Sequence, residues 1–454
     1  MTDVISEDPR PDCHRARHHR LLSRRAVMDR FVVTSNGPLS GTVRAGGAKN
    51  SALKLMAACL LADGRHVLTN VPQITDVDIM VEVLTAMGVT VARGATPDEL
   101  VVDTPVDVLP EAPYDLVEKM RASVVVLGPL LARHGRARVS MPGGDDFGHR
   151  PIDMHLHALE ALGAAFESSH GYVEGTVEST VASRPRLVGT RVVLEYPSHT
   201  ATDNVLMAAV LAKGTTVIEN AAREPELCDL AAFLNGMGAR VQGAGTSRIE
   251  VEGVDSLRPA RHRVVADRVV SATFLAAAGL AGGEVVVEDA RADHMDMLIR
   301  KLTQMGMHIT QDPDGLRAER DPSVRLRPVD IATLPYPGVA TDYKPLVVTL
   351  LTVAEGVGIV TENLFSGRFR YVDELRRMGA DIRTEGHHAV VRGVPRLSGA
   401  PVRSSDIRAG AALVLAGLAA EGETIVSDAH HVDRGYEDFA GKLSSLGAKV
   451  SRSD

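Results

Sequence analysis

Two glycine-containing stretches carry residue types that bind small anions and transfer protons. GGAKN at residues 46–50 places Lys49 and Asn50 directly before helix-forming residues, and a helix N-terminus beside an ammonium group suits a phosphate or carboxylate. PGGDDFGHRP at 142–151 holds two adjacent acids and Arg150. An acid in such a loop could protonate a substrate once the loop closed and excluded water. Taken singly, each stretch also fits a plainer interpretation, a surface lysine after a turn or a solvated acidic turn.

A set of arginines and one aspartate follow later in the chain. Arg368, Arg408 and Arg434 lie in SGRFRYVDE, SSDIRAG and HHVDRGYE. Guanidinium groups hold carboxylates and phosphates by two hydrogen bonds, so with Arg121 and the loop arginine they suit a small, highly anionic ligand, although each alone fits a surface salt bridge. Asp342, in GVATDYKPL, precedes a buried helix pattern. It would either cap that helix or accept a proton from a substrate hydroxyl.

Histidines and cysteines lack the spacing of a metal site. The paired histidines have no carboxylate or thiol partners at ligand spacing, and Cys13, Cys59 and Cys228 fit neither a disulfide framework nor a zinc site. We therefore expect no metal and a reducing, cytoplasmic location. Residues 1–27 carry Arg and His without the apolar core of a secretory signal, which predicts a disordered basic leader rather than a metal-binding tract.

Composition limits the class of protein. The 454 residues are 44% hydrophobic and 24% charged, as in globular proteins, and no apolar run is long enough to span a membrane. A net charge of −8, no Trp, 7 Tyr and 8 Phe disfavour binding to nucleic acid. Any anionic ligand must therefore be held by local groups of Arg and Lys.

Six internal repeats of about 70 residues organise the chain. Each contains a Leu-x-x-(Met/Leu)-Gly-x-x-apolar motif, and the six motif glycines are Gly88, Gly163, Gly238, Gly306, Gly379 and Gly447. Each repeat also contains a strongly apolar helical run, a glycine and a strand-like run, which indicates α/β modules with buried helices and sheets outside. The pattern alone leaves open a six-unit solenoid or two lobes of three units each.

In this order the repeats, GGAKN, PGGxxxGxRP, AAREPE at 221–226, the TD pair and DRGYE resemble the enolpyruvyl transferase family over residues 29–452. The resemblance implies a two-lobed inside-out α/β barrel with three repeats in each lobe and ligands between the lobes. It places a first lobe at 28–48 plus 267–454 and a second lobe at 49–266. The second lobe would carry 142–151 as a mobile loop.

The resemblance also implies the reaction and the roles of individual residues. The enolpyruvyl group of phosphoenolpyruvate would pass to the 3-hydroxyl of UDP-N-acetylglucosamine through a tetrahedral ketal, the first committed step of peptidoglycan synthesis, without metal or organic cofactor. The catalytic set would be Lys49, Asp145, Asp342 and Arg434. The phosphoenolpyruvate set would be Lys49, Asn50, Arg150, Arg368, Arg408 and Arg434. The UDP-sugar set would be Arg121, Arg150, Pro151, Ile152, Asp153, Met154, Tyr196, Pro197, Ser198, His199, Asp342 and Leu364.

Three positions depart from the family pattern. Asp145 stands where many members carry the cysteine that fosfomycin alkylates, so a carboxylic acid would protonate C3, and we expect intrinsic resistance to the drug. His199 and Thr200, in PSHTATDN where the family reads PSVGATEN, add bulk beside the expected nucleotide. Lys344 replaces a usual glutamine and is expected to add a cation near Asp342.

These departures leave the acceptor open. The leading hypothesis is UDP-N-acetylglucosamine, and a second is a paralogue acting on another uridine nucleotide such as UMP in nucleoside-antibiotic synthesis. A third is a catalytically silent binding protein, which the complete set of expected catalytic residues argues against. RPIDMH and AAREPE disfavour a shikimate-type acceptor.

Overall fold

The computed structural model describes residues 29–141, 152–178, 185–365 and 367–453. The leader at 1–27 and the whole loop 142–151, with Asp145, Arg150 and Pro151, lie outside this part of the chain. None of the described helices combines the length and apolar character that a membrane crossing needs.

Six four-stranded sheets repeat one pairing pattern, in which one pair of neighbouring strands is parallel and two are antiparallel. Three sheets come from the middle of the chain: β14 (Arg261–Arg263), β3 (Gly64–Thr69), β5 (Leu100–Thr104) and β4 (Thr90–Arg93); β6 (Glu111–Ala112), β7 (Arg136–Ser140), β9 (Tyr172–Val177) and β8 (Ala164–Ser169); β10 (Arg191–Val193), β11 (Thr215–Glu219), β13 (Arg248–Glu252) and β12 (Arg240–Gln242). The other three are β23 (Pro401–Arg403), β25 (Glu423–Ser427), β1 (Arg30–Thr34) and β26 (Lys449–Ser453); β16 (His308–Asp312), β17 (Gly315–Arg320), β15 (Gly283–Glu288) and β2 (Leu39–Arg44); β18 (Ile331–Ala332), β19 (Val357–Thr361), β21 (His388–Arg392) and β20 (Asp381–Glu385). Strands β22 (Leu397–Ser398) and β24 (Ala420–Glu421) form a short extra pair. The common pattern confirms that one α/β module occurs six times.

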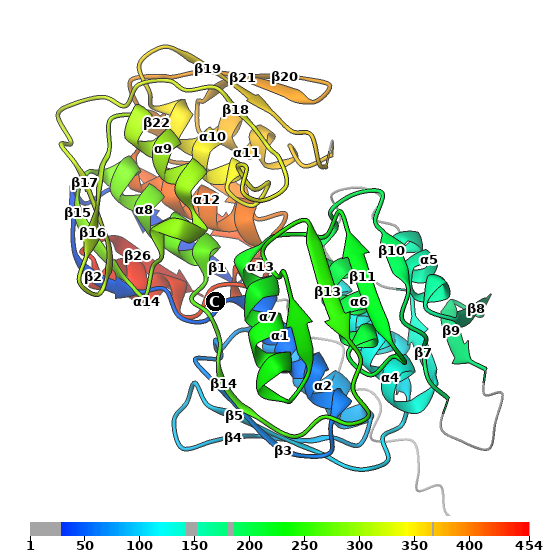
Figure 1. Cartoon of the computed structure of the whole chain (residues 1–454). Helices are drawn as coiled ribbons and strands as arrows, with labels where there is room; N and C mark the ends of the chain where they lie inside the picture. Colours follow the sequence, from blue (N-terminus) through cyan, green and yellow to red (C-terminus); the bar gives the residue numbers. More distant parts are fainter. Residues whose placement is uncertain (1–28, 142–151, 179–184, 366, 454) are drawn as a thin grey trace, which may run out of the picture.

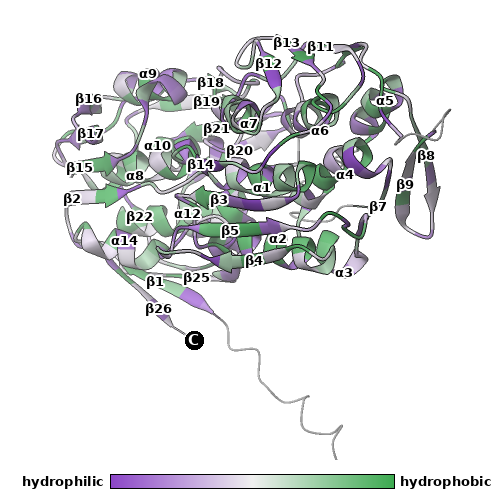
Figure 2. Ribbon diagram, turned by 60° about the horizontal axis from the view of Figure 1, so that its bottom comes forward, coloured by the Kyte–Doolittle hydropathy of each residue, from purple (hydrophilic) through white to green (hydrophobic). Residues whose placement is uncertain are grey.

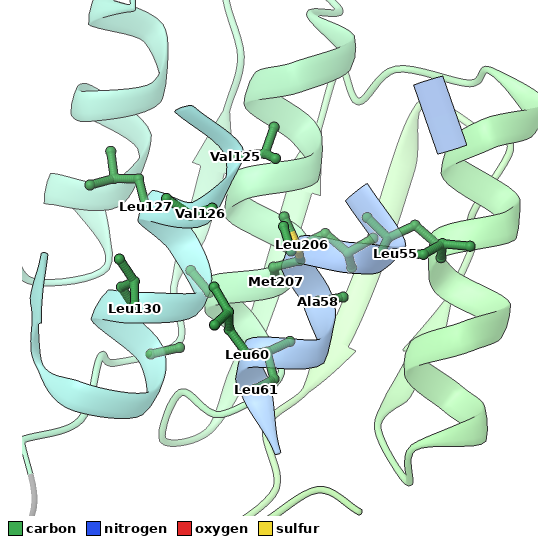
Figure 3. Close-up of a cluster of buried hydrophobic side chains, with 14 of the residues drawn as sticks. Leu55, Ala58, Leu60, Leu61, Val125, Val126, Leu127, Leu130, Leu206 and Met207 are labelled. Carbon is green, nitrogen blue, oxygen red and sulfur yellow. The ribbon is translucent and has the colours of Figure 1, made fainter. Parts of the chain in front are cut away.

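Six helices run inside the sheets and are buried over most of their surface, as their uniformly apolar sequences predict. They are α1 (Lys49–Ala58), α4 (Leu127–His134), α6 (His199–Ala209), α8 (Arg268–Ala281), α10 (Lys344–Thr352) and α12 (Ile407–Leu418). Figure 2 shows hydrophobic residues concentrated on α8 and α12. Figure 3 shows Leu55 of α1, Leu130 of α4 and Leu206 of α6 among the side chains of one core.

Six outer helices end at the repeat motif: α2 (Thr75–Ala86), α5 (Asp153–Ala161), α7 (Pro225–Gly236), α9 (Asp296–Gln304), α11 (Tyr371–Arg377) and α14 (Phe439–Ser445). The motif glycine follows each of them in the left-handed region, with φ from 86° to 105°. A residue with a Cβ is strained there, so these glycines act as the C-terminal stop of each helix. Short helices complete the chain: α3 (Tyr114–Val117), α13 (His430–Asp433), and the 3-10 turns η1 (Cys59–Leu61), η2 (Arg121–Val126) and η3 (Ala292–His294).

Buried hydrophobic residues form two separate cores, one from Ala52 to Val264 and one that combines Phe31–Ala45 with Val269–Val450. Figure 1 shows the two bodies side by side, with the N-terminal strands β1 and β2 among the C-terminal elements. We use "second lobe" for the body around the first of these cores and "first lobe" for the other. The lobe boundaries expected from the resemblance stay a prediction.

Two neighbouring strands of chain join the lobes. Gly47 and Ala266 form an antiparallel bridge, and the amide of Ala48 donates to the carbonyl of Val265 at 2.7 Å. A Cβ on Gly47 would lie 1.7 Å from the carbonyl oxygen of Asn70, so only glycine fits at this crossing. The crossing places Lys49, at the start of α1, directly between the two lobes.

Candidate active site

Lys49 and Arg434 share one buried carboxylate between the lobes. Lys49 Nζ lies 2.5 Å from Asp76 Oδ2, and Arg434 Nε donates to Asp76 Oδ1 at 2.8 Å. Lys49 comes from the first turn of α1 and Asp76 from the first turn of α2, both in the second lobe, whereas Arg434 follows α13 in the first lobe. Two residues separated by almost the whole sequence thus meet on one anion.

The charges in this group oppose the effect of burial. Burial alone would raise the pKa of Asp76, but Lys49 and Arg434 outweigh it and hold that pKa below its usual range. Burial lowers the pKa of Lys49, and the positive charges of Arg408 and Arg434 add to that effect, while Asp76 opposes it. The group is therefore a concentration of positive charge with one internal counter-ion, as an anion site requires.

A second carboxylate lies between two further arginines. Arg368 Nη1 donates to Asp342 Oδ1 at 2.7 Å, and Arg408 Nε donates to Asp342 Oδ2 at 3.4 Å. Arg368 lies in the turn before α11 and Arg408 in the first turn of α12, where Asp406 caps the helix. Both arginines are buried, while the Asp342 side chain keeps 27% of its surface exposed. Asp342 is thus the member of this group that solvent reaches most.

Asp342 is an ionised carboxylate and not a helix cap. Burial would raise its pKa, but Arg368 and Arg408 lower it far below the usual range. Tyr343, one residue later, occupies the N-cap position of α10 and no side chain caps that helix. The capping interpretation of Asp342 is therefore wrong. Its carboxylate pairs with the two arginines and is available to accept a proton.

The residues expected at the UDP-sugar lie at the start of helices in the second lobe. Ser198 caps α6, with its hydroxyl accepting from the amide of Ala201 at 3.3 Å, and Tyr196, Pro197 and His199 adjoin it. Ile152 is the N-cap of α5, followed by Asp153 and Met154, and Arg121 begins η2. Leu364 follows β19 in the first lobe.

Side-chain contacts tie these helix starts together. Thr200 Oγ1 lies 3.3 Å from His155 Nε2, and Asn204 Nδ2 donates to His155 Nδ1 at 2.9 Å, so α5 and α6 meet at their N-terminal ends. Burial lowers the pKa of His155 to about 4, with a further contribution from the charge of Arg121. His155 is neutral and structural, and the glycine-to-threonine departure at 200 is accommodated by a contact to it.

His199 contacts Lys54 of the second lobe and lies near enough to Asp342 of the first lobe for that charge to affect it. Burial and the charge of Lys54 hold the pKa of His199 well below its ordinary value, and the carboxylate of Asp342 is near enough to oppose that effect. Lys54 Nζ lies 2.7 Å from His199 Nδ1. The expected nucleotide end and the expected proton acceptor thus belong to one site.

Lys344 differs from its prediction. Its side chain is fully buried and lies 2.8 Å from Glu362 Oε2, and Nζ also donates to the carbonyl of Arg368 at 2.5 Å. The charge of Lys344, expected to act on Asp342, is neutralised by Glu362, a residue that the sequence analysis did not single out. Lys344 therefore adds no free positive charge to the site.

Sequence reasoning also missed two acids that bridge the lobes. Asp76 and Glu226 both stand twelve residues before a repeat glycine, Gly88 and Gly238. Asp76 binds Arg434, and Glu226 binds Arg268 at 3.0 Å, so each acid of the second lobe pairs with a cation of the first. Because the two acids occupy equivalent positions in two repeats, that spacing was the sequence signal that could have pointed to them.

The arrangement suits a small substrate with two anionic groups next to a hydroxyl-bearing one. Lys49, Arg368, Arg408 and Arg434 supply four cations around two carboxylates, and the helices α1 and α12 begin at these residues. In the part of the chain that the structure describes, no group of three or more His, Cys, Asp and Glu side chains could hold a metal ion.

Comparison with known proteins agrees with this geometry. Residues 33–443 match the family model described as EPSP synthase (3-phosphoshikimate 1-carboxyvinyltransferase). The chain is 51% identical over 430 residues to a UDP-N-acetylglucosamine 1-carboxyvinyltransferase of Nocardia farcinica, covering 94% of this chain and 99% of that protein. It is 49% identical over 427 residues to UDP-N-acetylglucosamine 1-carboxyvinyltransferase 2 of Carboxydothermus hydrogenoformans, with coverage of 94% and 99%.

The chain belongs to the enolpyruvyl transferase family. Among solved structures, this enolpyruvyl transferase is similar to NikO from Streptomyces tendae, described as an enolpyruvyl transferase, with a TM-score of 0.83, 25% identity and coverage of 94% and 99%. It shares the fold of EPSP synthase from Acinetobacter baumannii, with a TM-score of 0.71, 18% identity and coverage of 94% and 100%. The two-lobed architecture, and not a solenoid, is therefore confirmed.

Proposed function

We propose that this enzyme transfers the enolpyruvyl group of phosphoenolpyruvate to the 3-hydroxyl of UDP-N-acetylglucosamine and releases phosphate. The observation that carries the proposal is the pair of cation groups around Asp76 and Asp342, which matches a substrate with a phosphate and a carboxylate. Relatives about half identical over nearly the whole chain carry the name of that activity. We propose with this function a cytoplasmic location and a role at the first committed step of peptidoglycan synthesis.

Phosphoenolpyruvate would bind with its phosphate at Lys49, Asn50 and Arg434, joined by Arg150 from outside the described residues. Its carboxylate would bind Arg368 and Arg408, which both contact Asp342. A substrate carboxylate bound there would compete with Asp342 for the positive charges of Arg368 and Arg408, which lower the pKa of Asp342. The pKa of Asp342 therefore rises when phosphoenolpyruvate is bound, which makes its carboxylate a stronger base at the moment it is needed.

The acceptor would lie along the helix starts of the second lobe. Its nucleotide and sugar would contact Arg121, Ile152 to Met154 and Tyr196 to His199, with Leu364 from the first lobe and Arg150 and Pro151 from the loop. Its hydroxyl would approach Asp342.

The chemistry is addition followed by elimination. Asp342 takes the proton of the 3-hydroxyl as that oxygen bonds to C2, and an acid protonates C3, which gives a tetrahedral ketal phosphate. Loss of a proton from C3 and of phosphate from C2 then restores the double bond as an enol ether. We assign the acid role to Asp145, which lies outside the described residues.

A second acceptor, another uridine nucleotide such as UMP, is favoured by one observation. His199 and Thr200 stand where the family pattern has smaller residues, and His199 adds an imidazole at the start of α6. A bulkier subsite would suit a nucleotide without the second sugar.

The test is phosphate release from phosphoenolpyruvate with UDP-N-acetylglucosamine, with UMP or with no acceptor, followed by mass spectrometry of the product. Release with the UDP-sugar and gain of one enolpyruvyl group supports the proposal. Release with UMP alone moves the enzyme to the second acceptor. No release with either would leave a silent binding protein.

Asp145 can be tested separately. Asp145→Cys should keep activity and create sensitivity to fosfomycin, because the drug alkylates a thiol and not a carboxylate. Covalent labelling of Asp145 by fosfomycin in the unmodified chain would contradict the expected resistance, and an Asp145→Cys variant that stays insensitive would contradict the alignment of the loop.

A further inference from the structure

A buried ion pair adjoins Arg368, one of the two arginines that hold Asp342. Lys344 Nζ, at the start of α10, lies 2.8 Å from Glu362 Oε2, just after β19, and both side chains have no exposed surface. Lys344 also lies 3.9 Å from the ring centre of Phe369, one residue beyond Arg368. No step of the transfer reaction uses either member of the pair.

Glu362 accepts hydrogen bonds from several separate segments. Oε1 accepts from the hydroxyl of Thr333 at 2.7 Å and from the amides of Leu364 at 2.8 Å and Phe365 at 3.2 Å. Oε2 accepts from the hydroxyl of Thr341 at 2.7 Å. With Lys344, its two oxygens face five donors, far more than the two lone pairs of a neutral amide oxygen could accept.

Two residues that contact Glu362, Thr341 and Lys344, also contact Arg368 in the candidate substrate site. Thr341 Oγ1, which donates to Glu362, accepts from Arg368 Nη1 at 3.1 Å, and that same nitrogen donates to Asp342. Lys344 donates to the main-chain carbonyl of Arg368. The pair thus holds Arg368 at both its main chain and its guanidinium group.

The cost of burying two charges argues that the pair has a use. Replacing a buried ion pair by apolar residues is often neutral or stabilising, so stability alone does not call for one. Here the ionised carboxylate is what allows one side chain to bind the segments of Asp342, Leu364 and Arg368 together.

We propose that Glu362, kept ionised by Lys344, is a positioning residue that sets the place of Arg368 and thereby the binding of the substrate carboxylate. Thr341 is the link between Glu362 and Arg368. This inference rests on the proposed function, since it assigns the carboxylate of phosphoenolpyruvate to Arg368.

Two isosteric substitutions separate positioning from stability. Thr341→Val and Thr333→Val each remove one hydroxyl that donates to Glu362 at 2.7 Å, but only Thr341 also contacts Arg368. Thr341→Val should raise the KM for phosphoenolpyruvate about tenfold, as loss of one hydrogen bond to a charged group implies. Thr333→Val should leave that KM unchanged, and Thr341→Ser should restore it.

Phosphoenolpyruvate affinity, measured by calorimetry with and without UDP-N-acetylglucosamine, gives a second readout that needs no turnover. Equal effects of Thr341→Val and Thr333→Val, or no recovery in Thr341→Ser, overturn the positioning role. A different result is that the unmodified enzyme binds phosphoenolpyruvate and the two variants differ in affinity, while neither acceptor is turned over. That result overturns the proposed acceptor and leaves the positioning role of Glu362 standing. Absence of phosphoenolpyruvate binding in the unmodified enzyme overturns both proposals.

Discussion

Apart from Lys49 and Asp76 in the candidate site itself, each lobe of the described chain contains a buried lysine paired with a buried carboxylate, and these two pairs behave differently. In the second lobe, Lys54 Nζ lies 2.8 Å from Asp203 Oδ2, between the central helices α1 and α6. In the first lobe, Lys344 and Glu362 lie at the same distance. All four side chains are buried almost completely. Distance and burial therefore do not distinguish the pairs.

Hydrogen bonding does distinguish them. Apart from the ion pair with Lys54, the oxygens of Asp203 accept no hydrogen bond from any described residue, and burial raises the pKa of Asp203 to about 6 against the effect of Lys54. For Glu362, burial acts in the same direction, but Lys344 and the hydroxyls of Thr333 and Thr341 outweigh it and lower the pKa. Several donors thus hold the pKa of buried Glu362 below its ordinary value, whereas Lys54 alone does not offset the effect of burial on Asp203.

The pairs also act on different ends of the site. Lys344 and Glu362 contact the segments of Arg368 and Asp342, at the expected phosphoenolpyruvate end. Lys54 and Asp203 lie behind His199, at the expected nucleotide end. We expect the first pair to affect phosphoenolpyruvate and the second to affect the acceptor.

The largest effect is expected at Asp342, which accepts a hydrogen bond from Arg368, the residue that Thr341 links to Glu362. Asp342→Ala should lower kcat by about 10²–10⁴-fold, since it removes the proton acceptor. Phosphate release measures this, and an unchanged circular dichroism spectrum shows that the variant is folded. Full activity would refute the assigned role.

The next effect concerns stability at pH 7. Glu362→Gln should lower the free energy of unfolding by about 3–5 kcal/mol, and with it the melting temperature, because Lys344 is left buried without its charged partner. Asp203→Asn should lower the free energy of unfolding by less than Glu362→Gln does, because burial already disfavours the ionised form of Asp203. Calorimetric melting of both variants measures the difference, and equal costs would contradict the contrast between the pairs.

The pairs should also depend on pH with opposite signs. Asp203 has a raised pKa, so its contribution to the free energy of unfolding is fully present below pH 3.8 and falls, by at most about 3 kcal/mol, as the pH rises through about 6. Glu362 has a lowered pKa, so its contribution is present above pH 4.5 and is lost as the pH falls below that value.

Urea unfolding of the unmodified chain and both variants between pH 4 and 7 measures these slopes. Relative to Asp203→Asn, the unmodified chain should lose stability across this range as the pH rises. Relative to Glu362→Gln, it should stay level down to about pH 5. Parallel slopes would show that hydrogen bonding does not separate the two carboxylates.

The smallest effect is expected at His199. His199→Val should change the KM of the acceptor about threefold to tenfold and leave the KM for phosphoenolpyruvate unchanged, because one neutral hydrogen-bonding group at the nucleotide end is lost. Steady-state kinetics with both substrates, run beside Thr341→Val, checks whether the two changes affect opposite substrates. A shift in both KM values for either variant would break the division between the lobes.

Much of the fold could be predicted because its signals are local. The motif glycines Gly88, Gly163, Gly238, Gly306, Gly379 and Gly447 mark helix ends through their backbone conformation, and the apolar runs mark helices that are buried on all sides. Both signals depend on a few adjacent residues, so a single chain displays them. The choice of two lobes over a solenoid came from the resemblance instead.

The site was predicted in part for the same reason. Lys49, Asp342, Arg368, Arg408 and Arg434 stand in recognisable loops, and the structure gathers them between the lobes. Asp76 had only its place twelve residues before a repeat glycine as a signal, and Glu362 had none, since an acid after a strand is usually ordinary. Lys344 was interpreted as a free cation because its partner is not adjacent to it in the sequence.

The sequence by itself determined the six modules, the family and the side chains that carry charge to the site. Only the tertiary structure decided which charges are free and which are neutralised, because that depends on pairs such as Arg434 with Asp76 and Lys344 with Glu362. Ion pairing and burial act over a few ångströms in space. Residues far apart in the chain come within that range only after folding, and the pKa of each group follows from the neighbours it then acquires.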